Sequence, residues 1–475
     1  MCKSGTLLIQ PYNKQTLGVY MTFFGFEISK KGLFFNQAAL NVTAHNVANA
    51  DTKGYTRQRV IGSSIEPGMS SSLLADYSNR IGEGVDIQTI ERIRNDFLDR
   101  QFREENSSTG EWNVKSEALS YMEDIFKEPS DTGISHALNL FFNGLEELSK
   151  NVGSKDVRTS FMQQAISLTE TLNYTSNQLQ KALKDQEFQL AQSVKQVNET
   201  IKNIESLNEQ IARYELSGQN ANDLRDKRDV FMDQLSEYVD VTFSEVLVND
   251  RSNSAQQVLL PDPDQMPPFL SGKLKGHVDM ITGATDQQKG IPYFLNLLDD
   301  FAQKLVTEFN AVHKAGWTYP NTEENIESQT GINFFDDTCT KASNIRINPL
   351  LTNVNYIAGS SGKVEAGENT GNNENILALL ALRDDDTKGD FEAFLRSFAS
   401  ELGVETSYAN NMSTNRGYLL SNIEYRRESI SGVSLDEEMA NMIKYEKSYQ
   451  ASSRMITAMD EMLDYLINKT GLVGR

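Results

Sequence analysis

Apolar side chains recur with the period of an α-helix near both ends of the chain. In the N-terminal part, a stripe continues in alternating steps of four and three residues through Ile28, Gly32, Phe35, Ala39 and Val42. Such spacing places the stripe along one side of a helix and is typical of a coiled coil. We expect this helix to end near Asn49, because turn-forming residues follow it.

A matching stripe lies near the C-terminus. It repeats every seven residues through Leu435, Met442, Tyr449, Ile456 and Leu463. Ser434 and Glu437 form a capping-box pattern at its start. Because an isolated helix is marginally stable in water, each apolar stripe needs a partner. The sequence therefore predicts that the two terminal helices pair in a coiled coil, with the rest of the chain looped out at the far end.

The middle of the chain is also predominantly helical. Its longest pattern runs from Asp156 to Leu216, and a helix of this extent is roughly 90 Å long. A second helix follows a break at Gly218–Asn222, so the pair is expected to form an antiparallel hairpin. Further helices are expected at Ala118–Phe126, Ala137–Leu148, Ile291–His313 and from Glu374 to the end, with breaks near Gly389, Gly403 and Ser431–Gly432.

Two stretches depart from the helical pattern. Val241–Val246 is typical of a short strand, and a polar and proline-rich segment follows it as far as Pro268. Residues 318–372 are rich in Asn, Thr, Gly and Ser, and they contain candidate strands at Phe334–Phe335 and Ile345–Ile347. We expect both stretches to form irregular structure with short β elements.

The predicted fold is therefore mainly α and elongated, with paired terminal helices, a helical-bundle rod domain and a small β-containing insertion. Residues 1–20 are either an extension ahead of a natural start at Met21 or a genuine disordered tail. The remaining expected divisions are 21–60 with 433–475 as the terminal coiled-coil domain, 61–240 with 273–317 and 373–432 as the rod domain, and 241–272 with 318–372 as the small outer region.

Composition narrows the classes of function. The formal net charge is -21, and such an acidic chain repels phosphate backbones, so we expect no nucleic-acid partner. No apolar run approaches the length of a membrane span, so we expect no membrane insertion. The N-terminus lacks the hydrophobic region of a cleaved secretory signal peptide. If the protein leaves the cell, it uses a route without such a signal.

The chain shows no pattern of catalytic, metal-binding or cofactor-binding residues. Its 4 histidines and 2 cysteines have no ligand spacing, and the loop Gly359–Lys363 lacks the spacing of a phosphate-binding loop. Asp223, Asp226 and Asp229 alternate with basic residues, which predicts ion pairs along a solvated helix face rather than a calcium loop. We therefore expect no enzyme activity, no metal and no cofactor.

Segments at both ends resemble those of flagellar rod, hook and hook-associated proteins. The N-terminal signature of that family is an amphipathic helix followed by Asn-x-x-Thr-x-Gly-Tyr, and here these residues are Asn49, Thr52, Gly54 and Tyr55. At the other end, Gly432–Glu438 and Tyr449–Ser453 resemble the family's C-terminal helix, and the tail to Arg475 is similar to that of hook-associated members. The middle segments Asn222–Asp229, Ser271–Gly276 and Asn310–His313 also resemble hook-associated members.

The resemblance implies a structural adaptor of the bacterial flagellum that joins hook to filament. Its implied partners are further copies of itself in a helical ring, the hook protein, a second hook–filament junction protein and a flagellar export chaperone that covers the C-terminal stripe. Its implied location is extracellular, after type III export. The alternatives are another axial rod or hook subunit, and a secreted enzyme on a flagellar-type frame, for which the sequence shows no catalytic residues.

Two features depart from the family pattern. A polar and proline-rich stretch at residues 249–268 replaces the glycine-containing β segment that usually follows the helical hairpin. Residues 318–372 are too few to form the large outer β domain of many relatives. The resemblance therefore implies the axial packing role and leaves the outer surface without an expected function.

Overall fold

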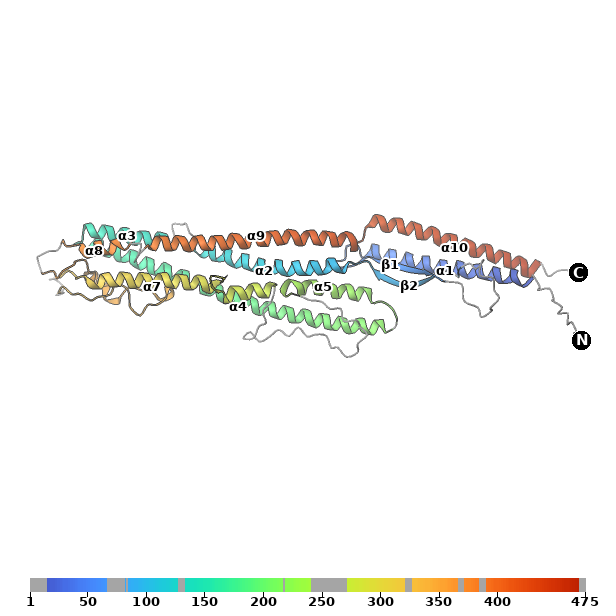
Figure 1. Cartoon of the computed structure of the whole chain (residues 1–475), viewed down its shortest axis with the longest axis horizontal. Helices are drawn as coiled ribbons and strands as arrows, with labels where there is room; N and C mark the ends of the chain where they lie inside the picture. The colour runs from blue at the N-terminus through green and yellow to red at the C-terminus, as the bar shows by residue number, and fades with distance from the viewer. Residues whose placement is uncertain are drawn as a thin grey trace, which may run out of the picture.

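The computed structural model is an elongated, mainly helical rod with both chain ends at one end of the molecule (Figure 1). It describes residues 15–65, 82, 84–126, 133–216, 218–240, 271–320, 327–365, 371–383 and 390–469, and it describes side chains from residue 25 onward. The α-helices are α1 (Gln15–Ala48), α2 (Asp96–Phe126), α3 (Ile134–Lys150), α4 (Lys155–Glu215), α5 (Asn222–Tyr238), α6 (Lys273–Thr282), α7 (Ile291–Ala315), α8 (Glu374–Ala381), α9 (Phe391–Ser431) and α10 (Leu435–Lys469).

The short elements complete the fold. Strands β1 (Gln58–Ser64) and β2 (Val85–Arg92) form an antiparallel hairpin whose register shifts between Ile61 and Gly62. A two-residue pair, β3 (Ala284–Thr285) and β4 (Gln288–Lys289), precedes α7. Three 3₁₀ turns lie in the segment before α8, namely η3 (Ala342–Asn344), η4 (Pro349–Thr352) and η5 (Val354–Tyr356).

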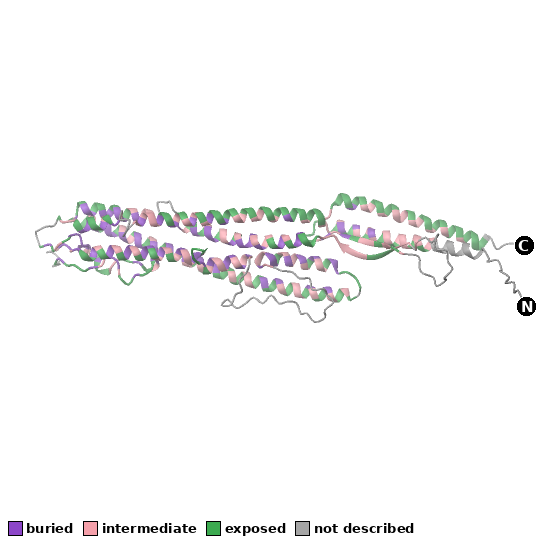
Figure 2. Ribbon diagram, viewed as in Figure 1, coloured by how far each residue is buried: buried purple, intermediate pink, exposed green. Residues whose placement is uncertain are grey.

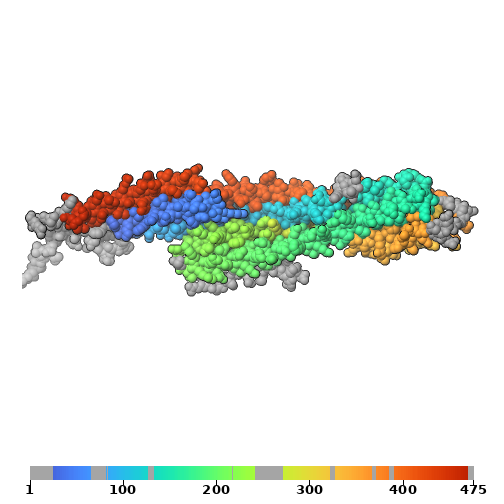
Figure 3. Space-filling view, turned by 180° about the vertical axis from the view of Figure 1, so that it is seen from behind, coloured from blue at the N-terminus to red at the C-terminus, as the bar shows by residue number. Residues whose placement is uncertain are grey.

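Long-range helix pairs hold the rod together. α1 packs along α10, and α2 packs along α9. α4 returns beside α3 and then pairs with α5, as the predicted helical hairpin does. The space-filling view shows α1 and α10 side by side at the end that carries both termini (Figure 3). The predicted mainly α, elongated fold with paired terminal helices is confirmed.

The main hydrophobic core lies at the end far from the termini, where buried residues gather in Figure 2. Phe141 of α3, Phe309 of α7 and Phe334 of the following segment are fully buried. The ring centroids of Phe141 and Phe309 are 5.2 Å apart, and those of Phe309 and Phe334 are 4.8 Å apart. Aromatic clusters of this kind bury large apolar areas and give this end a well-packed interior.

Several expectations differ from the structure. α9 continues through Gly403 without a break, because a single interior glycine costs only about 1 kcal/mol and its neighbour Leu402 is buried. The β1–β2 hairpin lies against α1, so the expected division at residue 60 falls inside β1. The candidate strands near Phe334 and Ile345 are reduced to one bridge, Phe335 to Ile347.

Some expectations lie outside the described residues. These are the strand at Val241–Val246, the proline-rich segment to Pro268, the break at Gly389, the C-terminal tail beyond Lys469 and most of residues 1–20. Within that first segment, α1 begins at Gln15, ahead of Met21.

Candidate assembly site

The paired terminal helices meet along a seam of small residues. A Cβ atom built on Gly25 would lie 2.4 Å from the Met459 Cε atom, and one on Gly32 would lie 3.4 Å from the Ser452 hydroxyl. From the first pair to the second, the residue number rises by seven in α1 and falls by seven in α10. Small residues let two helix backbones approach closely, so Gly25 and Gly32 set the spacing of an antiparallel pair.

A buried polar contact fixes the register at the other end of this seam. Asn46 lies two seven-residue steps beyond Gly32, and its side-chain amide donates to the Glu438 Oε2 atom at 3.0 Å. Asn46 is 1% exposed and Glu438 is 2% exposed. An unpaired buried carboxylate is costly, so any slip of one helix along the other breaks this contact at a large penalty.

The structure divides the predicted N-terminal stripe between two surfaces. Phe35 lies against Gly62 of β1, and Ile28 lies against Gly84 just before β2. Ala39 is buried at 2% exposure, and Val42 is half-buried. Ile28 and Phe35 therefore pack under the β hairpin, whereas Gly25 and Gly32 contact α10. The seven-residue spacing alone did not distinguish these two faces.

The C-terminal stripe is only partly covered in the single chain. Met442, Tyr449, Ile456 and Leu463 are half-buried, and Leu435 is 51% exposed. More large apolar side chains of α10 are exposed, and they are Met439, Ile443, Met455, Met462, Tyr465, Leu466 and Ile467. Apolar surface of this extent marks an interaction site in a water-soluble protein.

The family motif at residues 49–55 forms the turn that leaves α1. Gly54 has a φ of +80°, and a Cβ atom there would lie 2.1 Å from the Val230 Cγ2 atom of α5. Both the backbone angle and the close approach require glycine. Thr52 donates to the Asn49 side-chain oxygen at 3.3 Å, which stabilises the same turn.

Tyr55 links this turn to the seam. Its hydroxyl donates to the Asn46 Oδ1 atom at 2.7 Å, and the same oxygen accepts from the Gln58 backbone N–H at 3.0 Å. Burial raises the pKa of the Tyr55 hydroxyl, and the nearby carboxylates of Asp223, Asp226 and Glu438 raise it further. The hydroxyl therefore stays protonated and keeps its donor role.

Arg57 ties the start of β1 to the start of α10. Its guanidinium donates to Glu438 at 2.7 Å and to Glu437 at 2.6 Å, and its backbone N–H donates to the Ser431 carbonyl at 2.9 Å. The Glu437 backbone N–H lies 3.5 Å from the Ser434 hydroxyl, at the edge of hydrogen-bond distance. The end of α9, the start of α10 and the exit from α1 thus share one polar junction.

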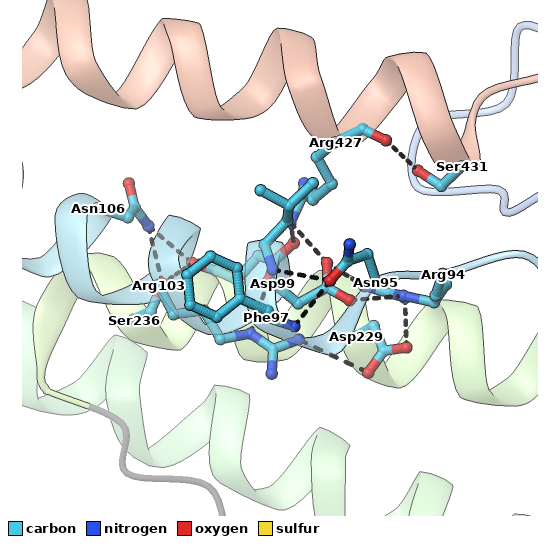
Figure 4. Close-up of polar contacts among 12 residues, drawn as sticks. Arg94, Asn95, Phe97, Asp99, Arg103, Asn106, Asp229, Ser236, Arg427 and Ser431 are labelled. Carbon is cyan, nitrogen blue, oxygen red and sulfur yellow. Dashed lines mark hydrogen bonds and ion pairs between the residues drawn. The ribbon is translucent and has the colours of Figure 1, made fainter.

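A network of arginines and aspartates joins this junction to the rod. The carboxylates come from one face of α5 and from α2, and the guanidinium groups come from β2, the segment after it, α2 and α9. Figure 4 shows part of this network, with Arg94, Arg103 and Arg427 around Asp99 and Asp229. Arg92 at the end of β2 contacts Asp226 at 2.8 Å and Asp229 at 2.7 Å. Arg94 bonds to Asp229 and lies 2.9 Å from Asp99 of α2.

Asp233 extends the network to α9. It accepts from Arg103 of α2 at 2.8 Å and from Arg427 of α9 at 2.6 Å. The Arg427 guanidinium also lies 4.0 Å from the ring centroid of Phe102, where a cation–π contact stabilises it. The network therefore connects α5, α2, α9 and β2 at the base of the terminal pair.

The expectation of a solvated face for these aspartates is wrong for two of the three. Asp226 is 4% exposed and Asp229 is 8% exposed, and their ion pairs join different elements. Asp223 alone keeps an exposed carboxylate, which accepts from Gln58 at 2.8 Å. The interleaved basic residues gave the pattern of a surface helix, while the true partners are distant in the chain.

The two buried aspartates differ in their protonation energetics. Burial raises the pKa of Asp226, although Arg92 and the Thr56 backbone N–H oppose this. Burial acts on Asp229 in the same sense, but the guanidinium groups of Arg94 and Arg92 outweigh it and lower the pKa. Asp229 is therefore the better-compensated charge of the pair.

Sequence reasoning placed Asp226 and Asp229 on a solvated face, and it missed the junction role of the other residues: Asn46, Arg57, Arg92, Arg94, Asp233, Arg427 and Glu438. One signal was available, because Asp226, Asp229 and Asp233 are spaced by three and four residues and so share a helix face. The arginines carry no comparable local pattern.

Within the described ranges, no group of three or more His, Cys, Asp and Glu side chains is arranged to hold a metal ion. No described helix combines the length and apolar character of a membrane span.

Known proteins with similar sequences point to one class. Residues 28–56 match the family of the flagella basal body rod protein, and residues 427–469 match the C-terminal family of the flagellar basal body rod FlgEFG protein. Residues 119–261 match the flagellar hook-associated protein FlgK helical domain. These matches cover both terminal helices and the rod hairpin, so the chain is a structural protein of the bacterial flagellum.

Full-length relatives narrow the class. The chain is 32% identical to flagellar hook-associated protein 1 of Bacillus subtilis (strain 168), over 96% of this chain and 99% of that protein. It is 23% identical to the protein of the same name in Salmonella typhimurium, over 92% and 98%. The flagellar hook junction protein FlgK from Burkholderia pseudomallei shares the fold, with a TM-score of 0.54, 14% identity, and coverage of 70% of this chain and 100% of that chain. The chain belongs to the flagellar hook-associated protein 1 family.

Proposed function

We infer that the chain is a structural adaptor that joins the flagellar hook to the filament. The observation that carries this function is the terminal helix pair, which is held in register but leaves large apolar side chains of α10 exposed. An adaptor of this kind needs terminal helices in a fixed orientation, and it needs a contact surface that other subunits can reach. The polar junction fixes the orientation of the terminal helices, and the exposed apolar side chains of α10 form the contact surface.

We propose that the partners on this surface are further copies of the chain, arranged as a helical ring. Open head-to-tail contacts generate such arrays when the same surfaces meet in every copy. The hook protein would contact the ring on one side and a second junction protein on the other. An export chaperone would cover α10 before assembly, because its apolar side chains would otherwise promote aggregation. Export would follow the flagellar type III route without a cleaved signal peptide.

We propose that the packing residues of the assembly surface include the predicted stripes. On α10 these are Leu435, Met442, Tyr449, Ile456 and Leu463. On α1 the stripe residues Ile28, Phe35, Ala39 and Val42 would support this surface from inside the terminal domain, where Ile28 and Phe35 pack under the β1–β2 hairpin. The motif residues Asn49, Thr52, Gly54 and Tyr55 would orient the pair. The β1–β2 hairpin packs on α1, so we extend the proposed terminal domain from residue 60 to residue 95. The rod and outer divisions stand otherwise as proposed from the sequence.

Deletion of the gene in its own bacterium tests the function. We expect hooks without filaments, with flagellin monomer released into the medium, and restoration of filaments by the wild-type gene. Electron microscopy of sheared flagella and analysis of culture supernatants measure both outcomes. Normal filaments in the deletion strain would contradict the adaptor function.

A substitution tests the assembly surface itself. Leu463→Asp places a charge among half-buried apolar side chains of α10, so we expect secreted but unassembled protein and loss of motility. Thr457→Asp adds the same charge at an exposed position of the same helix and is the matched control. Equal motility of the two variants would argue against the proposed surface.

A further inference from the structure

The outward face of α9 carries no charge over about five helical turns. Every exposed residue from Val404 to Asn422 is uncharged. The two charged residues in this span are engaged elsewhere in the rod, because Glu405 binds Lys289 at 3.0 Å and Arg416 binds Glu105 at 3.2 Å. In a chain with 23% charged residues and a net charge of -21, this face is an exception that needs a reason.

The face also has the spacing of a helix-packing stripe. From Val404, exposed residues follow in alternating steps of four and three through Tyr408, Asn411, Asn415, Tyr418, Asn422 and Tyr425. The three tyrosines are 52%, 73% and 76% exposed. In the single chain α9 packs against α2 mainly through its opposite side, and Figure 2 shows much of its outward side exposed. Tyr408 lies at the border of the stripe, because its ring also meets Trp112 of α2 edge-on at 5.4 Å. The stripe repeats a coiled-coil period toward solvent.

This composition is unfavourable for a helix surface that only meets water. Asn, Ser, Thr and Tyr are weaker helix formers than Glu, Lys or Arg, which dominate ordinary exposed faces. The exposed part of α4 shows the ordinary pattern, with Lys181, Lys195, Glu199 and Lys202 on its surface. Depletion of charge together with enrichment in Tyr is typical of the core of a protein–protein interface.

We propose that this α9 stripe docks against a second copy of the chain, as a lateral contact separate from the terminal pair. The proposal rests on the assembly of copies proposed above. Two acidic copies repel one another unless the surfaces that meet lack charge, and the stripe meets this condition. Only Gly432–Ser434 separate α9 from α10, and the two helices follow one edge of the molecule (Figure 1). A copy seated on α10 is therefore placed to continue along α9.

Cross-linking in assembled flagella tests the proposal. A photoreactive phenylalanine analogue replaces Tyr418 in the full-length chain, which is produced in the deletion strain, and isolated hooks with filaments are irradiated. We expect a product of twice the chain mass that contains only this chain, and no such product from the dilute secreted monomer. The same analogue at Tyr408 gives a second labelled variant. The proposal is overturned if the cross-linked product contains a different protein, or if neither variant gives a product.

Charge insertion gives an independent readout. Asn411→Lys with Asn415→Lys adds charge to the stripe without weakening the helix, because lysine is the better helix former. We expect about a tenfold drop in filaments per cell with an unchanged unfolding midpoint. Asn198→Lys, at an exposed position among the charges of α4, is the control and should leave filaments intact. Full assembly of the double variant would overturn the proposal.

These results separate the inference from the adaptor function. If the wild-type chain fails to restore filaments to the deletion strain, the adaptor function fails. If the wild-type chain restores filaments but the α9 positions give no copy-to-copy product, the adaptor function stands and the lateral contact alone is excluded.

Discussion

The far end of the rod and the terminal helix pair are built from the same kind of element but differ in what they bury. The far end encloses Phe141, Phe309 and Phe334 completely, together with most of the chain's other buried apolar residues. Among the described side chains of α1 and α10, Ala39 alone is a buried apolar residue. The rod is therefore stabilised by its own core, whereas the terminal pair leaves its apolar side chains for contacts beyond the chain.

The polar junction explains how the two regions stay joined. Directional contacts join them, such as the Thr56 backbone N–H with Asp226 at 3.0 Å and Arg92 with Asp229 at 2.7 Å. Hydrogen-bonded ion pairs specify one orientation more strictly than apolar contacts do, although their net contribution to stability is smaller.

The largest effect should come from the rod core. Phe309→Ala removes a fully buried ring and should lower the free energy of unfolding by about 4 kcal/mol. Met442→Ala in the half-buried face of α10 should cost about 1 kcal/mol or less in the free chain. Denaturant unfolding followed by circular dichroism measures both. Equal losses would show that the terminal pair is as well packed as the rod.

The junction should give the next largest effect. Asp229→Asn removes the carboxylate that pairs with both Arg94 and Arg92. We expect it to lower the free energy of unfolding by about 3 kcal/mol at pH 7. Asp226→Asn should cost much less, because burial disfavours the charge of Asp226. Unfolding of both variants side by side measures the difference, and a larger loss for Asp226→Asn would contradict this assignment.

The same two aspartates give opposite pH dependences. The folded-state pKa of Asp229 is lowered, so its stabilisation is present above its ordinary value of 3.8 and is lost as the pH falls through the lower folded value. The pKa of Asp226 is raised, so its contribution is greatest below 3.8 and is lost as the pH rises through its folded value. The carboxyl signals of the two residues in a pH titration should therefore shift at clearly separated pH values.

A smaller effect is expected at the exit from α1. Gly54→Ala should destabilise the terminal pair by about 2 kcal/mol, because alanine is strained at positive φ and its Cβ atom meets Val230. Val230→Ala in the same chain should restore part of the loss by removing the clash. Proteolysis rates of α1 and α10 measure the effect, and no rescue would show that backbone strain alone accounts for it.

The smallest expected effect is a pH response confined to the rod. Burial, with a minor contribution from Lys273, lowers the pKa of His277 from 6.5 to about 4. The folded chain therefore binds fewer protons than the unfolded chain, and stability falls as the pH drops from 6.5 toward 4. The loss from this residue at pH 5.5 should be about 1 kcal/mol. His277→Asn, which keeps a donor toward Gln186, should reduce the slope, and an unchanged slope would contradict the assignment.

Local periodicity predicted the helices and their pairing well. The pattern from Asp156 to Leu216 corresponds to α4, and the terminal stripes correspond to α1 and α10. The two seven-residue series also contain the seam residues, but they do not show that Gly32 contacts α10 while Phe35 contacts β1. A helical period fixes which residues share a face and leaves open what covers that face.

The β1–β2 hairpin and the junction could not be predicted in the same way. The segment that joins the two hairpin strands is about 20 residues long, far longer than the two to five residues of a typical hairpin loop. Arg92, Arg94 and Arg427 each bind carboxylates that lie far away in the sequence. Contacts of this kind depend on the tertiary arrangement and not on local spacing, so the aspartates were assigned to a solvated face.

The most direct test of the account is hydrogen exchange on the full-length chain, free and assembled in isolated hooks with filaments. We expect slow exchange in α3, α4 and α7 in both states. In α1 and α10 we expect fast exchange in the free chain and strong protection after assembly. If α1 and α10 are already as protected as the rod in the free chain and gain nothing on assembly, the terminal pair is not an open assembly surface and the account is wrong.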